Sequence, residues 1–147
     1  MPIVSEVMTA NVQAVAPEDS LERAAQWMEL LNVGSLPVCT GKRLVGIVTD
    51  RDITVRGIAA GLAPAAARVG EVMSTPVIWC TEDQDTEQVL RIMADAQVRR
   101  IPVIGAGREL VGMVSIGDLA TKSPGPVDKV VREISTPCEP DGSPTNS

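Results

Sequence analysis

The chain has 147 residues, which is enough for one compact domain or for two small units that share a core. Its formal net charge of −6 disfavours binding along a nucleic acid. It contains no His, Phe or Tyr, so its core must consist of aliphatic side chains and Met, and its three widely spaced cysteines without a histidine co-ligand predict no zinc site. The N-terminus lacks a signal-peptide pattern, and no run reaches the roughly 18 apolar residues of a membrane span. We therefore expect a soluble, cytoplasmic protein.

An internal repeat is the most informative feature of the chain. Glu6-Val7-Met8 recurs 65 residues later as Glu71-Val72-Met73, and Leu44-Val45-Gly46 recurs 66 residues later as Leu110-Val111-Gly112. Recurrence at a nearly constant spacing indicates that one structural unit is present twice. The predicted organisation is a first copy at 1–61, a linker at 62–68, a second copy at 69–123, and a C-terminal tail at 124–147 with one possible short helix.

In the first copy, residues 12–15 predict an extended segment, and Asp19 or Ser20 is a natural N-cap for the helix that follows. The apolar face of that helix is predicted to contain Leu21, Ala24, Ala25, Met28 and Leu31. Residues 36–39 and 44–48 predict two strands joined by a polar turn. A second helix is expected to run to about residue 60, with Gly61 as its C-cap.

The second copy repeats this order, with an extended segment at 77–80, a helix capped by Asp85, strands at 101–104 and 110–114, and a helix after Ser115. The apolar face of its first helix is predicted to contain Val89, Ile92, Met93 and Ala96. The fold class is thus α/β (α+β), built from two β-α-β-β-α units. Because a single unit of this size buries little surface, we expect the two to pack against each other.

The ordered motifs (Glu-Val-Met, an Ile/Leu-Pro-Val strand, Leu-Val-Gly-Ile-Val-Thr and a terminal Thr/Ser-x-x-Asp) resemble a CBS domain, and their double occurrence resembles a Bateman module. The resemblance implies two units packed sheet to sheet about a pseudo-twofold axis, with two clefts between them. Many family members bind AMP, ADP, ATP, NAD-type nucleotides or S-adenosylmethionine there, and many form homodimers.

Each copy places a hydroxyl and a carboxylate three residues apart at a strand–helix junction: Thr49 and Asp52, then Ser115 and Asp118. Such a hydroxyl can donate to a phosphate near a helix start, and such an Asp can accept hydrogen bonds from ribose hydroxyls. The same spacing is also a common helix-capping pattern, so both interpretations stay open for either copy alone. Occurrence in both copies favours nucleotide binding.

Arg99 and Arg100 precede the Ile-Pro-Val strand of the second copy, a position that lies near the ligand phosphates in the family. A planar guanidinium suits phosphate oxygens, although two solvated arginines at a helix end are the alternative. The corresponding positions of the two copies differ. The first copy has Gly34 and Ser35 where the second has the two arginines, and it has Arg51 where the second has Gly117. We therefore predict two unequal clefts, one of which binds nucleotide better.

A base would need an apolar slot, which we expect to be lined by Val12, Val15, Val77, Ile78, Pro37 and Pro102. Taken one by one, these are more often core residues. Trp79 is a candidate for stacking on the base, with a place in the core or in a dimer interface as the favoured alternative.

The sequence thus predicts a non-catalytic sensor that binds an adenosine-type nucleotide (AMP, ATP or NAD-like) as a regulatory ligand, requires no cofactor, and regulates a separate effector protein or its own assembly as a homodimer. The alternative is a dimerising scaffold without nucleotide. An enzyme is disfavoured because imidazole-based catalysis is impossible without histidine. No nucleic acid, membrane or metal is expected as a partner.

Overall fold

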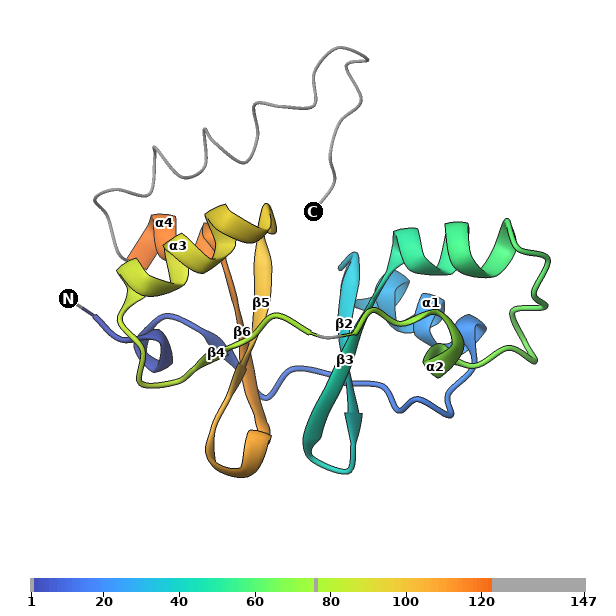
Figure 1. Cartoon of the computed structure of the whole chain (residues 1–147), viewed down its shortest axis with the longest axis horizontal. Coiled ribbons are helices and arrows are strands. Elements are labelled where there is room, and N and C mark those ends of the chain that lie inside the picture. Colours follow the sequence, from blue (N-terminus) through green and yellow to red (C-terminus); the bar gives the residue numbers. More distant parts are fainter. Residues whose placement is uncertain (1, 76, 123–147) are drawn as a thin grey trace, which may run out of the picture. The chain divides into compact units, whose positions relative to one another are not determined.

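A computed structural model describes residues 2–75 and 77–122, which form two compact units (Figure 1). Among the described residues, unit 1 contains 2–12, 78–106 and 110–122. Unit 2 contains 13–75, 77 and 107–109. The predicted tail at 124–147, with its possible helix and Cys138, lies outside the described residues.

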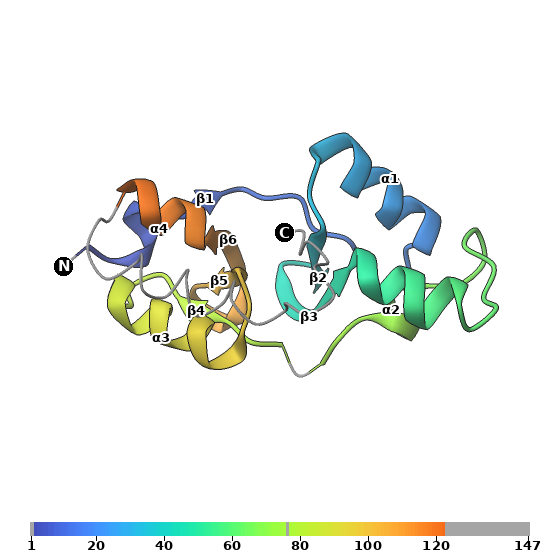
Figure 2. The same ribbon diagram turned by 90° about the horizontal axis from the view of Figure 1, so that it is seen from above.

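Unit 1 is a four-stranded sheet with two helices. Its strands, in the sheet order β1-β6-β5-β4, are β1 (Thr9–Ala10), β6 (Leu110–Ser115), β5 (Arg100–Ile104) and β4 (Cys80–Thr81). The neighbours β1–β6 and β6–β5 are antiparallel, while β5–β4 is parallel. Its helical elements are η1 (Val4–Glu6), α3 (Thr86–Ala96) and α4 (Ile116–Lys122). Figure 2 shows α3 and α4 beside each other, and their buried side chains form one core with those of β5 and β6.

Unit 2 repeats this design around a two-stranded sheet. Its elements are α1 (Leu21–Leu31), β2 (Ser35–Thr40), β3 (Arg43–Thr49), the π-helix η2 (Asp52–Ile58) and α2 (Val69–Val72). A parallel bridge joins Val15 to Val38, and an antiparallel bridge joins Ile47 to Ser74. These bridges stand at the positions of the β4–β5 and β1–β6 pairings of unit 1, so both units place the same four segments side by side.

Each copy of the repeat contributes its opening segment to the other copy. Thr9 of the first copy pairs with Met113 of the second, and Ser74 of the second copy pairs with Ile47 of the first. Of the extended segments predicted at 12–15 and 77–80, only the last residue of each, Val15 and Cys80, pairs with a strand. Residues 12–14 and 77–79 carry the chain from one unit into the other.

A glycine recurs in both Leu-Val-Gly motifs because the opening segment of the other copy passes very close to the strand that carries the motif. A Cβ added at Gly112 would lie 2.5 Å from the carbonyl oxygen of Thr9 and 2.9 Å from Sδ of Met8. In unit 2, a Cβ at Gly46 would lie 2.9 Å from Sδ of Met73. Only glycine allows two backbones to approach this closely at an extended position.

The predicted helix caps are largely confirmed. The Ser20 hydroxyl accepts a 3.0 Å hydrogen bond from the backbone N–H of Arg23, whereas the Asp19 carboxylate accepts from Ala16 instead. The Asp85 carboxylate accepts from the N–H of Glu87 at 2.7 Å. The N-caps are thus Ser20 for α1 and Asp85 for α3.

The predicted apolar faces are only partly correct. Ala25 and Leu31 of α1 are exposed, because only a narrow stripe of this helix faces the unit 2 core. On α3, Val89 and Met93 are buried as predicted, and Leu90 is buried as well. The residues of the predicted faces that are buried are Leu21, Ala24, Met28, Val89 and Met93, while Ile92 and Ala96 are half-buried.

The segment 62–68, expected to be a linker, belongs to unit 2 and covers the start of α1. The carbonyl of Ala67 accepts a 3.1 Å hydrogen bond from the N–H of Leu21, and the carbonyl of Pro64 accepts one of 3.0 Å from Glu22. Ala67 is buried in the unit 2 core. These bonds satisfy N–H groups that the first turn of a helix otherwise leaves without partners.

Cys39 and Cys80 are reduced and buried, and burial raises the pKa of both thiols, that of Cys80 to about 12. The thiol of an unfolded chain ionises near pH 9.0. Between this pH and the pKa of folded Cys80, the unfolded state therefore loses a proton that the folded state keeps. The free energy of unfolding must therefore fall as the pH rises through this range.

We expect the Cys80→Val variant, which installs the residue found at the matching position Val15, to lose less stability than the parent protein at alkaline pH. Urea unfolding at neutral pH and near pH 10 should show a difference of about 1 kcal/mol between the two proteins. Equal alkaline losses in both would contradict the burial of the thiol.

Candidate functional site

In unit 1, Ser115 and Asp118 form a reciprocal helix cap. The Ser115 hydroxyl accepts a 3.0 Å hydrogen bond from the Asp118 N–H, and the Asp118 carboxylate accepts one of 3.0 Å from the Ser115 N–H. The capping interpretation of the motif is therefore observed. A carboxylate has about four acceptor positions on its two oxygens, so a cap and a ligand can share it.

Unit 2 repeats the cap at Thr49 and Asp52, again with two hydrogen bonds of 3.0 Å. Here the carboxylate has a further neighbour, since the hydroxyl of Ser74 lies 3.3 and 3.4 Å from its two oxygens. The sequence analysis missed Ser74 as a site residue. The available signal was a hydroxyl directly after the repeated Glu-Val-Met in both copies, namely Ser74 and Thr9.

The two arginines of unit 1 lie beside its cap. The carbonyl of Arg99 accepts a 3.0 Å hydrogen bond from the N–H of Ile116, and Arg100 stands opposite Ser115 in the β5–β6 register. The structure thus brings Arg99, Arg100, Ser115 and Asp118 to one edge of the unit 1 sheet. Both arginines are half-buried.

The matching edge of unit 2 has the same backbone geometry with a different charge. The carbonyl of Gly34 accepts a 2.9 Å hydrogen bond from the N–H of Asp50, and Ser35 stands opposite Thr49. Arg51 is exposed and adjoins Asp52 at the start of η2. The two edges therefore differ: Arg99 and Arg100 stand at the start of β5 in unit 1, whereas Arg51 follows β3 in unit 2.

The residues predicted to line a base slot are distributed over both units. Pro37 and Pro102 are buried in β2 and β5, opposite Ile47 and Met113. Val15 is buried in the core of unit 2, Val12 and Val77 are half-buried, and Ile78 is 44% exposed. Trp79 is 37% exposed, so it does not fill a core position within the chain.

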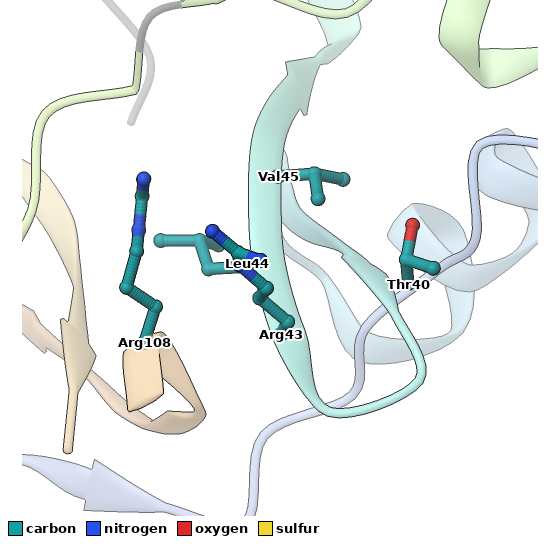
Figure 3. A pocket seen from close by; sticks show the side chains of 5 residues that line it. All are labelled: Thr40, Arg43, Leu44, Val45 and Arg108. Carbon is teal, nitrogen blue, oxygen red and sulfur yellow. The ribbon is translucent and has the colours of Figure 1, made fainter. Parts of the chain in front are cut away.

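Unit 2 contains a separate cavity of about 390 Å³, lined by Thr40, Arg43, Leu44, Val45 and Arg108 (Figure 3). None of the predicted site residues lines it. Across residues 2–75 and 77–122, no group of three or more His, Cys, Asp or Glu side chains is placed to hold a metal ion. Over the same residues, no helix is both long and apolar enough to traverse a bilayer.

The family model of the CBS domain matches residues 4–56 and 69–125. The chain therefore belongs to the CBS-domain family and carries the domain twice, which confirms the fold class and the resemblance inferred from its motifs. CBS domains are generally regulatory, non-catalytic modules.

Individual relatives match nearly the whole chain. Hypoxic response protein 1 of Mycobacterium tuberculosis is 36% identical over 141 residues, which cover 95% of this chain and 96% of the relative. A crystal structure of Hypoxic Response Protein I with two coordinated zinc ions has a TM-score of 0.78 at 37% identity, covering 84% of this chain and all of the other. The crystal structure of CBSX2 in complex with AMP matches with a TM-score of 0.71 at 24% identity, covering 82% of this chain and 95% of the other, and it shows a shared fold.

Proposed function

We propose that the chain is a ligand-sensing module that binds an adenosine-type nucleotide such as AMP, ATP or NAD and thereby regulates a separate effector protein or its own assembly as a homodimer. The observation that carries this proposal is the unit 1 edge, where Arg99 and Arg100 lie beside the Ser115–Asp118 cap. Hydroxyl, carboxylate and guanidinium groups are the partners that a ribose phosphate requires.

Each group has a distinct role in the proposal. The Asp118 carboxylate keeps its bond to the cap and accepts hydrogen bonds from ribose hydroxyls. The guanidinium groups of Arg99 and Arg100 pair with phosphate oxygens, for which their planar fork is suited. Because the whole chain carries a net charge of −6, attraction of a nucleotide depends on such a local pair of cations.

Unit 2 offers the weaker set of phosphate partners. Its edge has Gly34 and Ser35 at the positions of the two arginines. We therefore assign the tighter binding to the unit 1 residues.

The relatives support the proposal at the level of the fold. CBSX2 was crystallised with AMP, so this fold can hold a nucleotide. The zinc ions of Hypoxic Response Protein I are not carried over to this chain, because it has no histidine and its described residues contain no cluster of three His, Cys, Asp or Glu side chains that could hold a metal ion.

A dimerising scaffold without nucleotide is the second candidate. Large apolar side chains are exposed on the helices of unit 2, with Leu30 of α1 at 74% and Ile58 of η2 at 51%. Leu31 and Val55 add to this surface at 42% and 47%. Where such side chains form one contiguous patch, they commonly mark a contact between proteins.

Calorimetric titration separates the two candidates. We expect saturable binding of AMP, ATP or NAD below millimolar concentration, with one class of site clearly tighter than the other. AMP lacking both ribose hydroxyls should bind at least tenfold more weakly, because the carboxylate then has no donor to accept from. Absence of binding at millimolar concentrations of every ligand, together with a dimer in sedimentation, would establish the scaffold instead.

A further inference from the structure

Two side chains of the π-helix η2 hold the opening segment of the second copy in unit 2. Arg56 donates through Nη1 to the carbonyl oxygens of Val72, at 3.2 Å, and Met73, at 3.4 Å. Four residues before Arg56, the Asp52 carboxylate lies 3.3 and 3.4 Å from the hydroxyl of Ser74. One helix thus binds three consecutive residues of that segment through a cation and an anion.

The contacts of Arg56 follow from the end of α2. A helix leaves its last carbonyl groups without intrahelical partners, and the negative end of its dipole favours a cation there. The helix α2 ends at Val72, and Arg56 supplies the cation from another element. The second copy has Lys122 at the position that corresponds to Arg56. A long cationic side chain is therefore a common feature of this position in the repeat.

The backbone of Ser74 is fixed as well. Its N–H donates to the carbonyl of Ile47 at 2.8 Å, and its own carbonyl accepts from the N–H of Ile47 at 3.3 Å. Because Arg56 binds the two residues that precede Ser74, the segment cannot shift along β3 without breaking these bonds. The hydroxyl of Ser74 is consequently held beside Asp52.

The Asp52 carboxylate is restrained from two sides as a result. Its Oδ2 atom accepts a 3.0 Å hydrogen bond from the N–H of Thr49 and lies 3.3 Å from the Ser74 hydroxyl. A carboxylate has about four acceptor positions, so it can serve the cap, Ser74 and a ligand together. Because the carboxylate is held in place before a ligand arrives, less side-chain entropy is lost on binding.

We propose that Arg56 is a positioning residue for nucleotide binding at the unit 2 edge. It holds Ser74 in place, and Ser74 orients the Asp52 carboxylate toward the ribose hydroxyls. Arg56 itself touches no ligand in this role. The inference rests on the proposed nucleotide function and adds to it the group that prepares the weaker of the two sites.

Calorimetric titration with AMP tests this role, and the tighter class of site, assigned to unit 1, is the internal reference. Arg56→Met removes the donors of the side chain, so we expect the weaker class to lose about fivefold in affinity while the tighter class stays unchanged. Ser74→Ala should give the same loss, and the double variant should lose no more, because both changes release the same carboxylate. Arg56→Lys should stay within about twofold of the parent protein, since its ammonium group can still donate to both carbonyls.

The matched control is Arg68→Met. It removes the same charge from an exposed arginine of unit 2 whose guanidinium donates to neither of the two carbonyls, so the weaker class should keep its affinity. Amide hydrogen exchange of the free protein adds a readout that needs no nucleotide. In Arg56→Met the N–H of Ser74 should exchange faster, whereas the N–H of Cys39, which donates to Val15 in the same unit, should keep its rate.

Four results would overturn the inference: an unchanged affinity of the weaker class in Arg56→Met, an equal loss in Arg68→Met, additive losses in the double variant, or unchanged exchange at Ser74. Absence of the weaker class in the parent protein, with the tighter class intact, would also overturn it, and the proposed function would stand. Absence of both classes would remove the proposed function, and the inference with it.

Discussion

The Gly112→Ala variant is expected to lose about 3 kcal/mol of unfolding free energy, the upper end of the usual range for overpacking. The added methyl group would lie 2.5 Å from the carbonyl oxygen of Thr9, and a backbone oxygen paired in a sheet cannot rotate away. Relief therefore requires β1 to separate from β6, which breaks the pairing of Thr9 with Met113 and of Ala10 with Gly112. Urea unfolding measures the loss.

Two other glycines provide graded controls. At Gly46 the nearest atom is the flexible Met73 thioether at 2.9 Å, followed by a carbonyl oxygen at 3.2 Å, so Gly46→Ala should cost about 1–2 kcal/mol. At Gly117, in α4, the nearest atom is 3.5 Å away, and alanine should stabilise the helix by about 0.5–1 kcal/mol. If all three variants unfolded at the same urea concentration, the close crossing of β1 over β6 would be wrong.

The strands of each hairpin were predictable because their signals are local. Apolar runs around a polar turn predicted strands at 36–39 and 44–48, and the structure has β2 and β3 there. The caps at Ser20 and Asp85 were predictable for the same reason, since a cap depends on residues a few positions apart.

The exchange of opening segments was not predictable from such signals. Thr9 pairs with Met113, a partner more than a hundred residues away, through a strand of two residues. A strand this short carries no periodic pattern that would specify its partner. The association of Ser74 with Asp52 was missed for the same reason, because it exists only once the exchange has placed residue 74 beside β3.

At the candidate site, the repeat identified the corresponding Ser/Thr and Asp positions of the two copies but could not tell a helix cap from a ribose site. The Ser/Thr-x-x-Asp pattern fits both roles equally well, and the structure shows the cap in both copies. Ligand binding at these positions stays a prediction. Since the two roles use the same carboxylate, a variant must preserve the cap while removing the charge.

Asp118→Asn meets that requirement and is expected to weaken nucleotide binding more than tenfold, or about 1.4 kcal/mol. The asparagine side-chain oxygen can still accept the Ser115 N–H, so the cap is kept and the loss of melting temperature should be smaller than in Asp118→Ala. The second terminal atom becomes an NH₂ donor, which cannot accept from a ribose hydroxyl. Calorimetry with AMP and thermal unfolding of the free protein give the two quantities.

Asp118→Ala and Asp52→Asn complete the comparison. Alanine removes the cap acceptor as well as the charge, so we expect it to lower stability by about 1 kcal/mol in addition to weakening binding. Asp52→Asn makes the same chemical change in unit 2 and should leave the tighter binding event largely intact, because that event is assigned to the unit 1 edge. A normal AMP affinity in Asp118→Asn combined with reduced stability in Asp118→Ala would mean that this carboxylate only caps α4, and the nucleotide, if bound at all, must use other groups.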